Sequence, residues 1–220
     1  MESGSADGGA MNRSARCKAI GITGGIGVGK SIVAQAFARR GALVLEADRI
    51  GHEVLREDAE VQRALAQTFG AEVIGAEGQP DRKSLGERVF GDPEALAALN
   101  RIVHPPLLAR LRERLDAGRR DPSVPLVVVD AALIAEWRIR SWFDFVIAVT
   151  APAEQVRARL LAKGLSQEQI ERRIASQLPE EARVKDADMV IQNDGDVWNI
   201  ETAVEKIWRR TAGSRMSNVR

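Results

Sequence analysis

A glycine-rich segment that ends in Lys-Ser constrains the fold of this chain more than any other part of its sequence. The segment GGIGVGKS, residues 24–31, matches the pattern G-x-x-x-x-G-K-[ST], in which the backbone wraps around phosphate groups. The apolar run KAIGIT precedes it, and a helical pattern with Val33 and Phe37 four residues apart follows it. Strand, glycine turn and helix in this order predict a phosphate-binding loop at a helix N-terminus, whose dipole favours anions.

The residue types of this loop predict how it holds a nucleotide. Lys30 is expected to bridge the β- and γ-phosphates, and the Ser31 hydroxyl is expected to bind Mg²⁺. Ile32 stands where many such loops carry a second hydroxyl, a departure that Ser31 makes tolerable. The residues expected to bind ATP here are Gly25, Ile26, Gly27, Val28, Gly29, Lys30, Ser31 and Ile32.

The rest of the chain predicts an α/β fold with a doubly wound parallel sheet. Further apolar runs that read as strands occur at 42–48, 125–130, 143–150 and 189–192, with helical patterns between them. Residues 49–117 contain helical patterns but no convincing strand, which predicts a helical insert over the sheet. We expect helices at 82–90, from Asp92-Pro93 to a break at His104-Pro105-Pro106, and onward through Leu115. Later helices are expected from Pro152, from Ser166, whose spacing to Gln169 fits a capping box, and at 197–208.

Two acidic residues follow predicted strands, at the sheet edge where open α/β folds bind ligands. Asp48 is expected to end the second strand. Its carboxylate could take a proton from an attacking hydroxyl or hold a metal-bound water, or it could cap the following helix, and position alone leaves these roles open. Asp130 follows the strand at 125–130, where a carboxylate could order the water shell of a metal ion.

Composition limits the partners of this chain. Lys and Arg number 32 against 31 Asp and Glu, a formal net charge of +1, which argues against a dedicated nucleic-acid binder. No apolar run approaches 18 residues, so we expect no membrane span. Cys17 is the single cysteine, so no intramolecular disulfide is possible, and this fits a reducing compartment. We therefore predict a cytoplasmic location. For Cys17 itself we predict a packing role rather than a redox role.

Further segments carry a resemblance to a known family. In order they are GITGGIGVGKS, EADRIGHEVL, GQPDRKSLGERVF with LNRIVHP, DAALIAE, and ASQLPEEARVKDADMVIQNDG. This series resembles the dephospho-coenzyme A kinases over about residues 18–208. The resemblance implies a P-loop NTPase-type kinase core, a helical CoA-binding insert and a lid. It also implies ATP with Mg²⁺ as the phosphoryl source, dephospho-CoA as the acceptor substrate and CoA as the product, by transfer to the ribose 3′-hydroxyl.

The domain organisation expected on this basis has one kinase domain between two tails. The core takes residues 17–50 and 121–208, the insert about 51–120 and the lid about 157–177. Residues 1–16 and 209–220 are rich in small and polar residues and are expected to be unstructured tails. The oligomeric state is left open.

The resemblance also assigns roles to single residues. Asp48 matches the acid that activates the acceptor hydroxyl, and Arg82 matches an arginine that faces the substrate. His104 matches the family's His-Pro pair, either as a substrate contact or as a packed helix cap. Asn193 matches an asparagine near the adenine, or it is a turn residue.

The lid alignment is ambiguous and the sequence departs from the family elsewhere. With a one-residue deletion, Arg159 and Lys163 match an arginine pair that binds ATP, whereas an ungapped alignment places Ala158 and Ala162 there. Ala131 and Ala132 stand where many relatives have a proline before two leucines. The alternative functions are another nucleotide or small-molecule P-loop kinase, distinguished by its acceptor, and a nucleotide-gated switch, which would need neither Asp48 nor Arg82.

Overall fold

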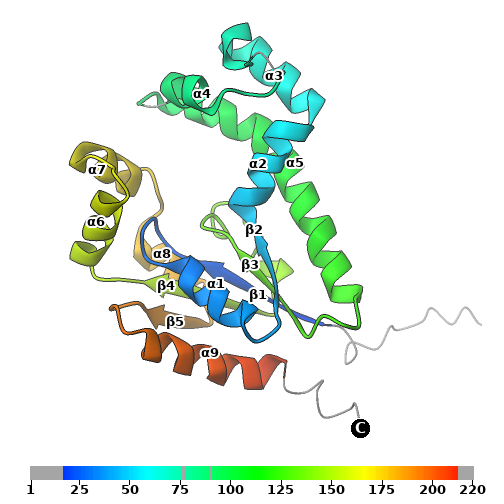
Figure 1. The fold of residues 1–220 in the computed structure, drawn as a ribbon, viewed down its shortest axis with the longest axis vertical. Coiled ribbons are helices and arrows are strands. Elements are labelled where there is room, and N and C mark those ends of the chain that lie inside the picture. Colours follow the sequence, from blue (N-terminus) through cyan, green and yellow to red (C-terminus); the bar gives the residue numbers. More distant parts are fainter. Residues whose placement is uncertain (1–16, 76–77, 90, 213–220) are drawn as a thin grey trace, which may run out of the picture.

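A five-stranded parallel sheet forms the centre of the computed structural model, which describes residues 17–75, 78–89 and 91–212 (Figure 1). The strand order is β2-β3-β1-β4-β5, and every pairing between neighbours is parallel, which confirms the predicted fold class. The strands are β1 (Lys18–Thr23), β2 (Leu43–Glu46), β3 (Leu126–Asp130), β4 (Phe145–Thr150) and β5 (Met189–Gln192).

The strand order places a topological switch point at β1. From β1 the chain crosses over β3 to reach β2 on one side, whereas β4 and β5 lie on the other side. Asp130 is in register with Ile22 of β1 and with Glu46 of β2, so three strands end at one level. In open α/β sheets, ligands bind outside the carboxyl ends of the strands at such a point. The functional site is therefore expected at this edge.

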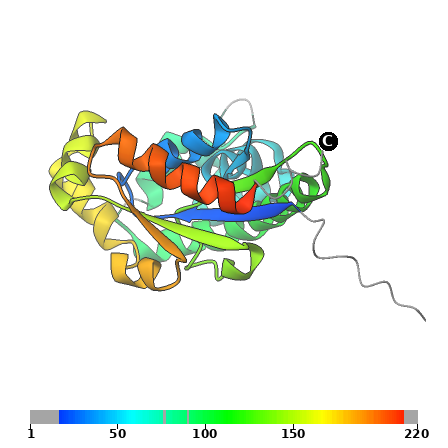
Figure 2. The same ribbon diagram turned by 90° about the horizontal axis from the view of Figure 1, so that it is seen from below.

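Helices cover both faces of the sheet because the central strands are apolar on both sides. In β3, Leu126 and Val128 face a core that includes residues of α1 (Lys30–Ala38) and α9 (Val197–Thr211). Val127 and Val129 face the opposite core with α5 (Pro93–Arg120). Figure 2 shows α9 beside α1 on one side of the strands. The period-2 alternation of a strand thus divides one short run between two cores.

Helix α5 corrects the predicted break at His104-Pro105-Pro106. It runs without interruption from Pro93 to Arg120, and the Asp92 carboxylate caps it by accepting two backbone N–H bonds at 2.9 and 3.0 Å. Its buried residues Val103, Leu107, Leu111 and Leu115 recur every four positions. Burial of four such side chains contributes about 6–12 kcal/mol, against about 3 kcal/mol for each interior proline. The continuous apolar face therefore outweighs the local helix-breaking signal.

The remaining helices lie above and beside the sheet in Figure 1. Their bounds are α2 (Ala47–Glu57), α3 (Ala59–Phe69), α4 (Arg82–Val89), α6 (Ala153–Ala162), α7 (Gln167–Ala175) and α8 (Glu180–Lys185), with short 3-10 turns at Ala71–Val73 and Arg140–Trp142. The capping box at Ser166 and Gln169 is present as predicted. The division into core, insert and lid stays a prediction, and Leu111 and Leu115 of the expected insert pack in the same core as β3.

Other predicted boundaries also differ from the structure, and the strand expected at 143–150 begins only at Phe145. Strand β2 ends at Glu46, and α2 begins at Ala47 without a connecting loop, so the expected strand at 42–48 is too long. Helix α9 continues to Thr211, because Ile207 and Ala212 are buried in the core, so the tail predicted from residue 209 begins too early. The tail predicted at 1–16 and the rest of the C-terminal tail lie outside the described residues. Cys17 is buried, in line with a packing role.

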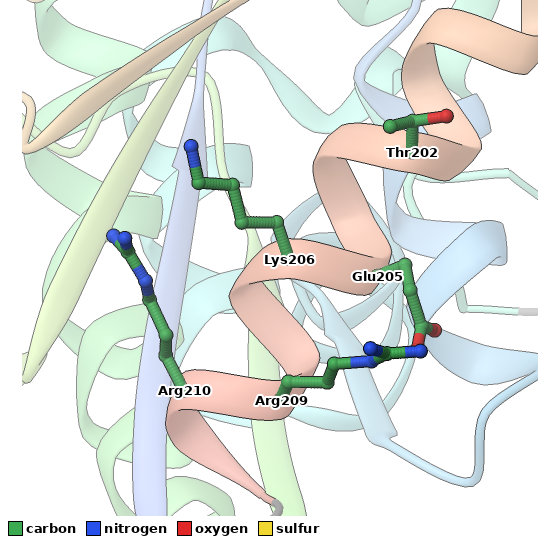
Figure 3. A pocket seen from close by; sticks show the side chains of 5 residues that line it. All are labelled: Thr202, Glu205, Lys206, Arg209 and Arg210. Atoms are coloured by element: carbon green, nitrogen blue, oxygen red, sulfur yellow. The ribbon is translucent and has the colours of Figure 1, made fainter.

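The outer face of α9 carries a shallow hollow lined mainly by long charged side chains (Figure 3). Arg209 pairs there with Glu205 at 2.7 Å. The Lys18 ammonium donates to the Arg210 carbonyl, so this end of α9 lies at the start of β1, away from the glycine-rich loop that follows it. Among the described residues, no helix combines the length and apolar character needed to cross a membrane.

Candidate active site

The glycine-rich loop connects β1 to α1 at the switch point of the sheet. Gly29 immediately precedes α1 with a backbone φ of 93°, a conformation that residues other than glycine rarely adopt. A Cβ atom at this position would also lie 2.1 Å from Nδ2 of Asn193. Glycine is therefore required here by both the backbone and its neighbour. The loop leads directly into the N-terminus of α1, as the sequence predicts.

Lys30 is the first residue of α1 and folds back over the loop. Its ammonium donates to the carbonyls of Gly24 at 3.1 Å and Gly25 at 3.2 Å. Burial lowers the pKa of Lys30 below its ordinary value, and the nearby carboxylates of Asp130 and Asp48 oppose this shift. Ser31 follows at an exposed position of the first helical turn, and Ile32 is half-buried. Cation, hydroxyl and loop amides thus share one end of α1.

Two carboxylates act electrostatically on Lys30, that of Asp130 at the end of β3 and that of Asp48 in the first turn of α2. Burial raises the pKa of Asp130 to about 6; the Lys30 charge lowers it, and Asp48 and Glu46 add to the rise. Asp48 is exposed in the first turn of α2, two residues after Glu46, which is both the last residue of β2 and the N-cap of α2. The predicted strand-end position and the helix-cap interpretation of Asp48 are therefore wrong. Its carboxylate instead stands free of the helix backbone and near the loop cation.

These residues fit a magnesium ion held mainly by nucleotide phosphates. Within the described parts of the chain, no three His, Cys, Asp or Glu side chains gather into a metal cage. Mg²⁺ commonly keeps several waters and takes one or two protein oxygens beside substrate phosphates. The exposed Ser31 hydroxyl and the Asp130 carboxylate offer such oxygens, and a divalent cation would relieve the repulsion among Asp130, Asp48 and Glu46.

Arg159 and Asn193 close over the other end of the glycine-rich loop. Arg159 of α6 donates to the carbonyls of Gly27 at 3.4 Å and Val28 at 3.3 Å, and to the side chain of Asn193 at 3.2 Å. Asn193, which follows β5, is 1% exposed and donates from Nδ2 to the Val28 carbonyl at 2.8 Å. The structure thus brings both sequence-predicted residues to the loop.

The other lid candidates take different positions. Lys163 is the C-cap residue of α6 and is exposed, and its positive charge is the smallest of the contributions to the shifted pKa of Lys30. Arg157 forms an ion pair with Glu171 of α7 at 2.7 Å. Ala158 and Ala162, which the ungapped alignment selects, are exposed and carry no polar group. The roles of Arg159 and Lys163 in binding ATP stay predictions.

His104 lies inside α5, so the interpretation as a helix cap is wrong. Its Nδ1 accepts a hydrogen bond from the indole N–H of Trp137 at 3.1 Å, and the rings meet edge to face at 5.3 Å. Burial lowers the pKa of His104, which favours the neutral ring. Because an indole N–H only donates, the proton of the neutral imidazole must be on Nε2. His104 thus has a packing partner and one remaining donor for a substrate.

Arg82 is the first residue of α4, and its side chain lies outside the described residues, so its expected contact with substrate stays a prediction. The preceding Asp81 starts this helix by accepting the N–H of Lys83 at 3.0 Å and the hydroxyl of Ser84 at 2.5 Å. The PDR segment therefore supplies a helix start, which places Arg82 at a helix N-terminus.

Sequence reasoning missed Gln177 and Arg183, which lie beside the first half of the loop, and Glu136, which pairs with Arg183. Gln177 Oε1 accepts the backbone N–H of Ile26 at 2.9 Å. Arg183 of α8 is 4% exposed and donates to Glu136 Oε1 at 3.0 Å. All three belong to the segments DAALIAE and ASQLPEEARVKDADMVIQNDG that carry the family resemblance. Membership of those segments was the available signal, because nothing in their local pattern separates these residues from solvated neighbours.

Comparisons with known proteins agree on one family. A sequence model of the family "Dephospho-CoA kinase" matches residues 18–199. The dephospho-CoA kinase of Aquifex aeolicus is 38% identical over 191 residues, covering 87% of this chain and 96% of that protein. The corresponding enzyme of Streptomyces avermitilis is 37% identical over 190 residues, covering 86% and 91%. The solved dephospho-CoA kinase of Campylobacter jejuni superposes with a TM-score of 0.61 at 26% identity, covering 89% and 98%.

Proposed function

The chain belongs to the dephospho-CoA kinase family, and we propose that Lys30, Asp48 and the glycine-rich loop carry out its reaction. In that reaction, ATP phosphorylates the ribose 3′-hydroxyl of dephospho-CoA, giving CoA and ADP, in the last step of CoA biosynthesis. The observation that supports the residue assignment is that Lys30 folds over the glycine-rich loop, while Asp48 follows β2, whose last residue is level with Asp130 and through it with Ile22 just before the loop. A base and a phosphate-binding cation at one site are what phosphoryl transfer to a hydroxyl requires.

The proposed reaction is one in-line displacement. The ribose 3′-oxygen attacks the γ-phosphorus, the bond between that phosphorus and the β,γ-bridging oxygen breaks, and ADP departs. The proton of the hydroxyl passes to the Asp48 carboxylate. Lys30 and the loop N–H groups would stabilise the negative charge on the phosphates during transfer. Ser31, and Asp130 through water, would hold Mg²⁺, which supplies further positive charge when it is bound.

The other predicted residues are proposed to position the two substrates. Arg159, Lys163 and Asn193 would hold ATP and exclude water, which would otherwise accept the phosphoryl group. Arg82 and His104 would contact dephospho-CoA, with His104 donating from Nε2. The cytoplasmic location and the absence of a nucleic-acid partner stay predictions from the sequence.

The test measures ADP release with dephospho-CoA, with nucleoside monophosphates, with shikimate and without acceptor. We expect ADP to form in step with phosphorylation of dephospho-CoA and slowly in the other reactions. Lys30→Ala serves as the inactive control, with turnover lower by about 10²–10³ or more. ADP release that is equal with and without acceptors would instead indicate a nucleotide switch, and preference for another acceptor would overturn the substrate assignment.

A further inference from the structure

Arg183 is a buried cation beside the glycine-rich loop. The proposed mechanism gives this arginine no role. It is 4% exposed, and its guanidinium donates to the Leu178 carbonyl at 2.8 Å and to Glu136 at 3.0 Å. A buried charge is costly unless it is paired, and Glu136 supplies that pair. Both partners come from outside the loop, so Arg183 is held in place without any contribution from a nucleotide.

Nη1 of the guanidinium, which donates to the Leu178 carbonyl, also lies near the start of the loop. A Cβ atom on Gly25 would lie 3.8 Å from Nη1 of Arg183, and Arg183 lines a cavity of about 410 Å³ together with Gly25 and Ile26. Lys30 reaches the same point, because its ammonium contacts the carbonyls of Gly24 and Gly25. Two cations therefore meet at Gly25, one from α1 and one from α8, with no side chain on Gly25 between them.

The hydrogen bonding of Arg183 is incomplete. Its Nε is buried and has no partner among the described residues, and neither has Oε2 of Glu136. Guanidinium carries five donors in a rigid fork, and a buried donor without an acceptor costs about 1–3 kcal/mol in free energy. An arginine held by one oxygen retains donors for an anionic ligand.

We propose that Arg183 binds the terminal phosphoryl group of ATP during transfer and that Glu136 is its positioning residue. This inference rests on the proposed function, in which Lys30 bridges the β- and γ-phosphates. Since Lys30 folds over Gly24 and Gly25, that end of the loop is where the γ-phosphate lies. There Arg183 offsets the negative charge that spreads over the oxygens of the transferred group, as a cation aimed at a moving phosphoryl does.

The test compares the binding of ATP and ADP by calorimetry, with Mg²⁺ and without acceptor, in wild type and Arg183→Lys. Lysine keeps the charge but loses the fork that reaches Glu136 and a phosphate together. We expect ATP affinity to fall at least tenfold and ADP affinity to stay within threefold, because only ATP has a γ-phosphate. In turnover with dephospho-CoA, kcat should fall by about 10²–10³. A parallel loss of ATP and ADP affinity would overturn the proposal.

A matched control separates this role from the general cost of altering a buried arginine. Arg119 is 8% exposed and donates to the Trp142 carbonyl at 2.9 Å and to Asp144 at 2.7 Å. Asp144 also accepts the N–H of Ala19, so this arginine lies at the opposite end of β1. Arg119→Lys should lower stability without changing the ratio of ATP to ADP affinity. A change in that ratio equal to the change in Arg183→Lys would count against Arg183.

A second variant keeps the proposal testable if Arg183→Lys does not fold. Glu136→Gln leaves the arginine in place but removes the charge that orients it. We expect a smaller loss of kcat and a smaller loss of ATP preference over ADP. An unchanged kcat and an unchanged ATP preference would remove Glu136 from the positioning role. Because the nucleotide measurements need no acceptor, they stand even if wild type phosphorylates a compound other than dephospho-CoA.

Discussion

Asn193 accepts a hydrogen bond from the Arg159 guanidinium at 3.2 Å, and this contact joins the segment after β5 to α6 directly against the glycine-rich loop. The same side chain donates to the Val28 carbonyl at 2.8 Å. The Asn193 backbone N–H is fixed by the Thr150 carbonyl at 2.7 Å at the end of β4. A single buried amide therefore ties together two strand ends, one helix and the loop.

Asn193→Ala is expected to lower both stability and affinity for ATP. It removes the shorter of the two hydrogen bonds to the Val28 carbonyl and leaves only the longer one from Arg159, which costs about 0.5–1.5 kcal/mol in free energy of unfolding. The KM for ATP should rise severalfold, because the loop loses its support, while kcat changes less. Chemical denaturation and steady-state kinetics measure these effects. The control is Asn199→Ala, at an exposed position of α9, which should change neither the free energy of unfolding nor the KM for ATP. Equal changes in the two variants would contradict the role of Asn193 in supporting the loop.

Asp48→Asn should reduce turnover and leave the fold intact. The Asp48 side chain caps no helix, so the loss of its charge in the first turn of α2 costs no more than about 1 kcal/mol. If Asp48 is the base, kcat should fall by about 10²–10⁴ while ATP binding is retained. The matched control is Asp58→Asn, since Asp58 caps α3 through the N–H groups of Glu60 and Val61. Near-normal kcat in Asp48→Asn would place the base elsewhere.

Asp130→Asn should stabilise the nucleotide-free protein at neutral pH. Burial raises the pKa of Asp130 to about 6, above its ordinary value of 3.8, so the folded state holds the proton more tightly than the unfolded state. The resulting stabilisation is present below about pH 4 and is lost as pH rises through 6. The variant should therefore unfold with a free energy similar to wild type at pH 4 and higher by about 1–3 kcal/mol at pH 7.5.

The measurement for Asp130 is the difference in unfolding free energy between the two proteins from pH 4 to pH 8, without nucleotide or metal. The Lys30 charge, which stabilises the carboxylate, reduces the difference but does not change its sign, because burial is the larger effect. A difference that does not depend on pH would contradict the raised pKa.

Lys163 provides a test of the lid alignment. If its ammonium binds ATP, Lys163→Ala should raise the KM for ATP severalfold, and Lys163→Arg should preserve or raise turnover because arginine binds phosphate bidentately. Lys206→Ala is the control, since that residue is exposed on α9 (Figure 3). Indifference to both changes at Lys163 would favour the ungapped alignment.

The predictable parts of this protein are those encoded by neighbouring residues. The loop at 24–31, the five strands and the capping box at Ser166 each depend on a short pattern, and each is found within the segment that the pattern marks, although β2 and β4 are shorter than predicted. Helix α5 shows the limit of such patterns. Pro105 and Pro106 signal a break locally, but the leucines that keep the helix intact are stabilised by strands that lie far away in the sequence.

The site was predictable where one residue acts through its own segment, and not where distant segments meet. Lys30 belongs to a motif, whereas Arg183 lies among charged residues that resemble a solvated helix face. Its burial depends on Glu136, 47 residues earlier, and its role depends on Gly25, still further away. Burial of this kind is a property of the assembled fold, so no local pattern marks the residue.

The position of β3 between β1 and β2 affects how the protein folds while it is being translated. Neither of the first two strands pairs with the other; both pair with β3, which ends at Asp130. At about 5–20 residues per second, the roughly 80 residues between β2 and the end of β3 take about 4–16 s to translate. During that interval the nascent chain presents apolar strands without partners. Pausing of translation before residue 130 would therefore prolong the stage at which chaperones are needed.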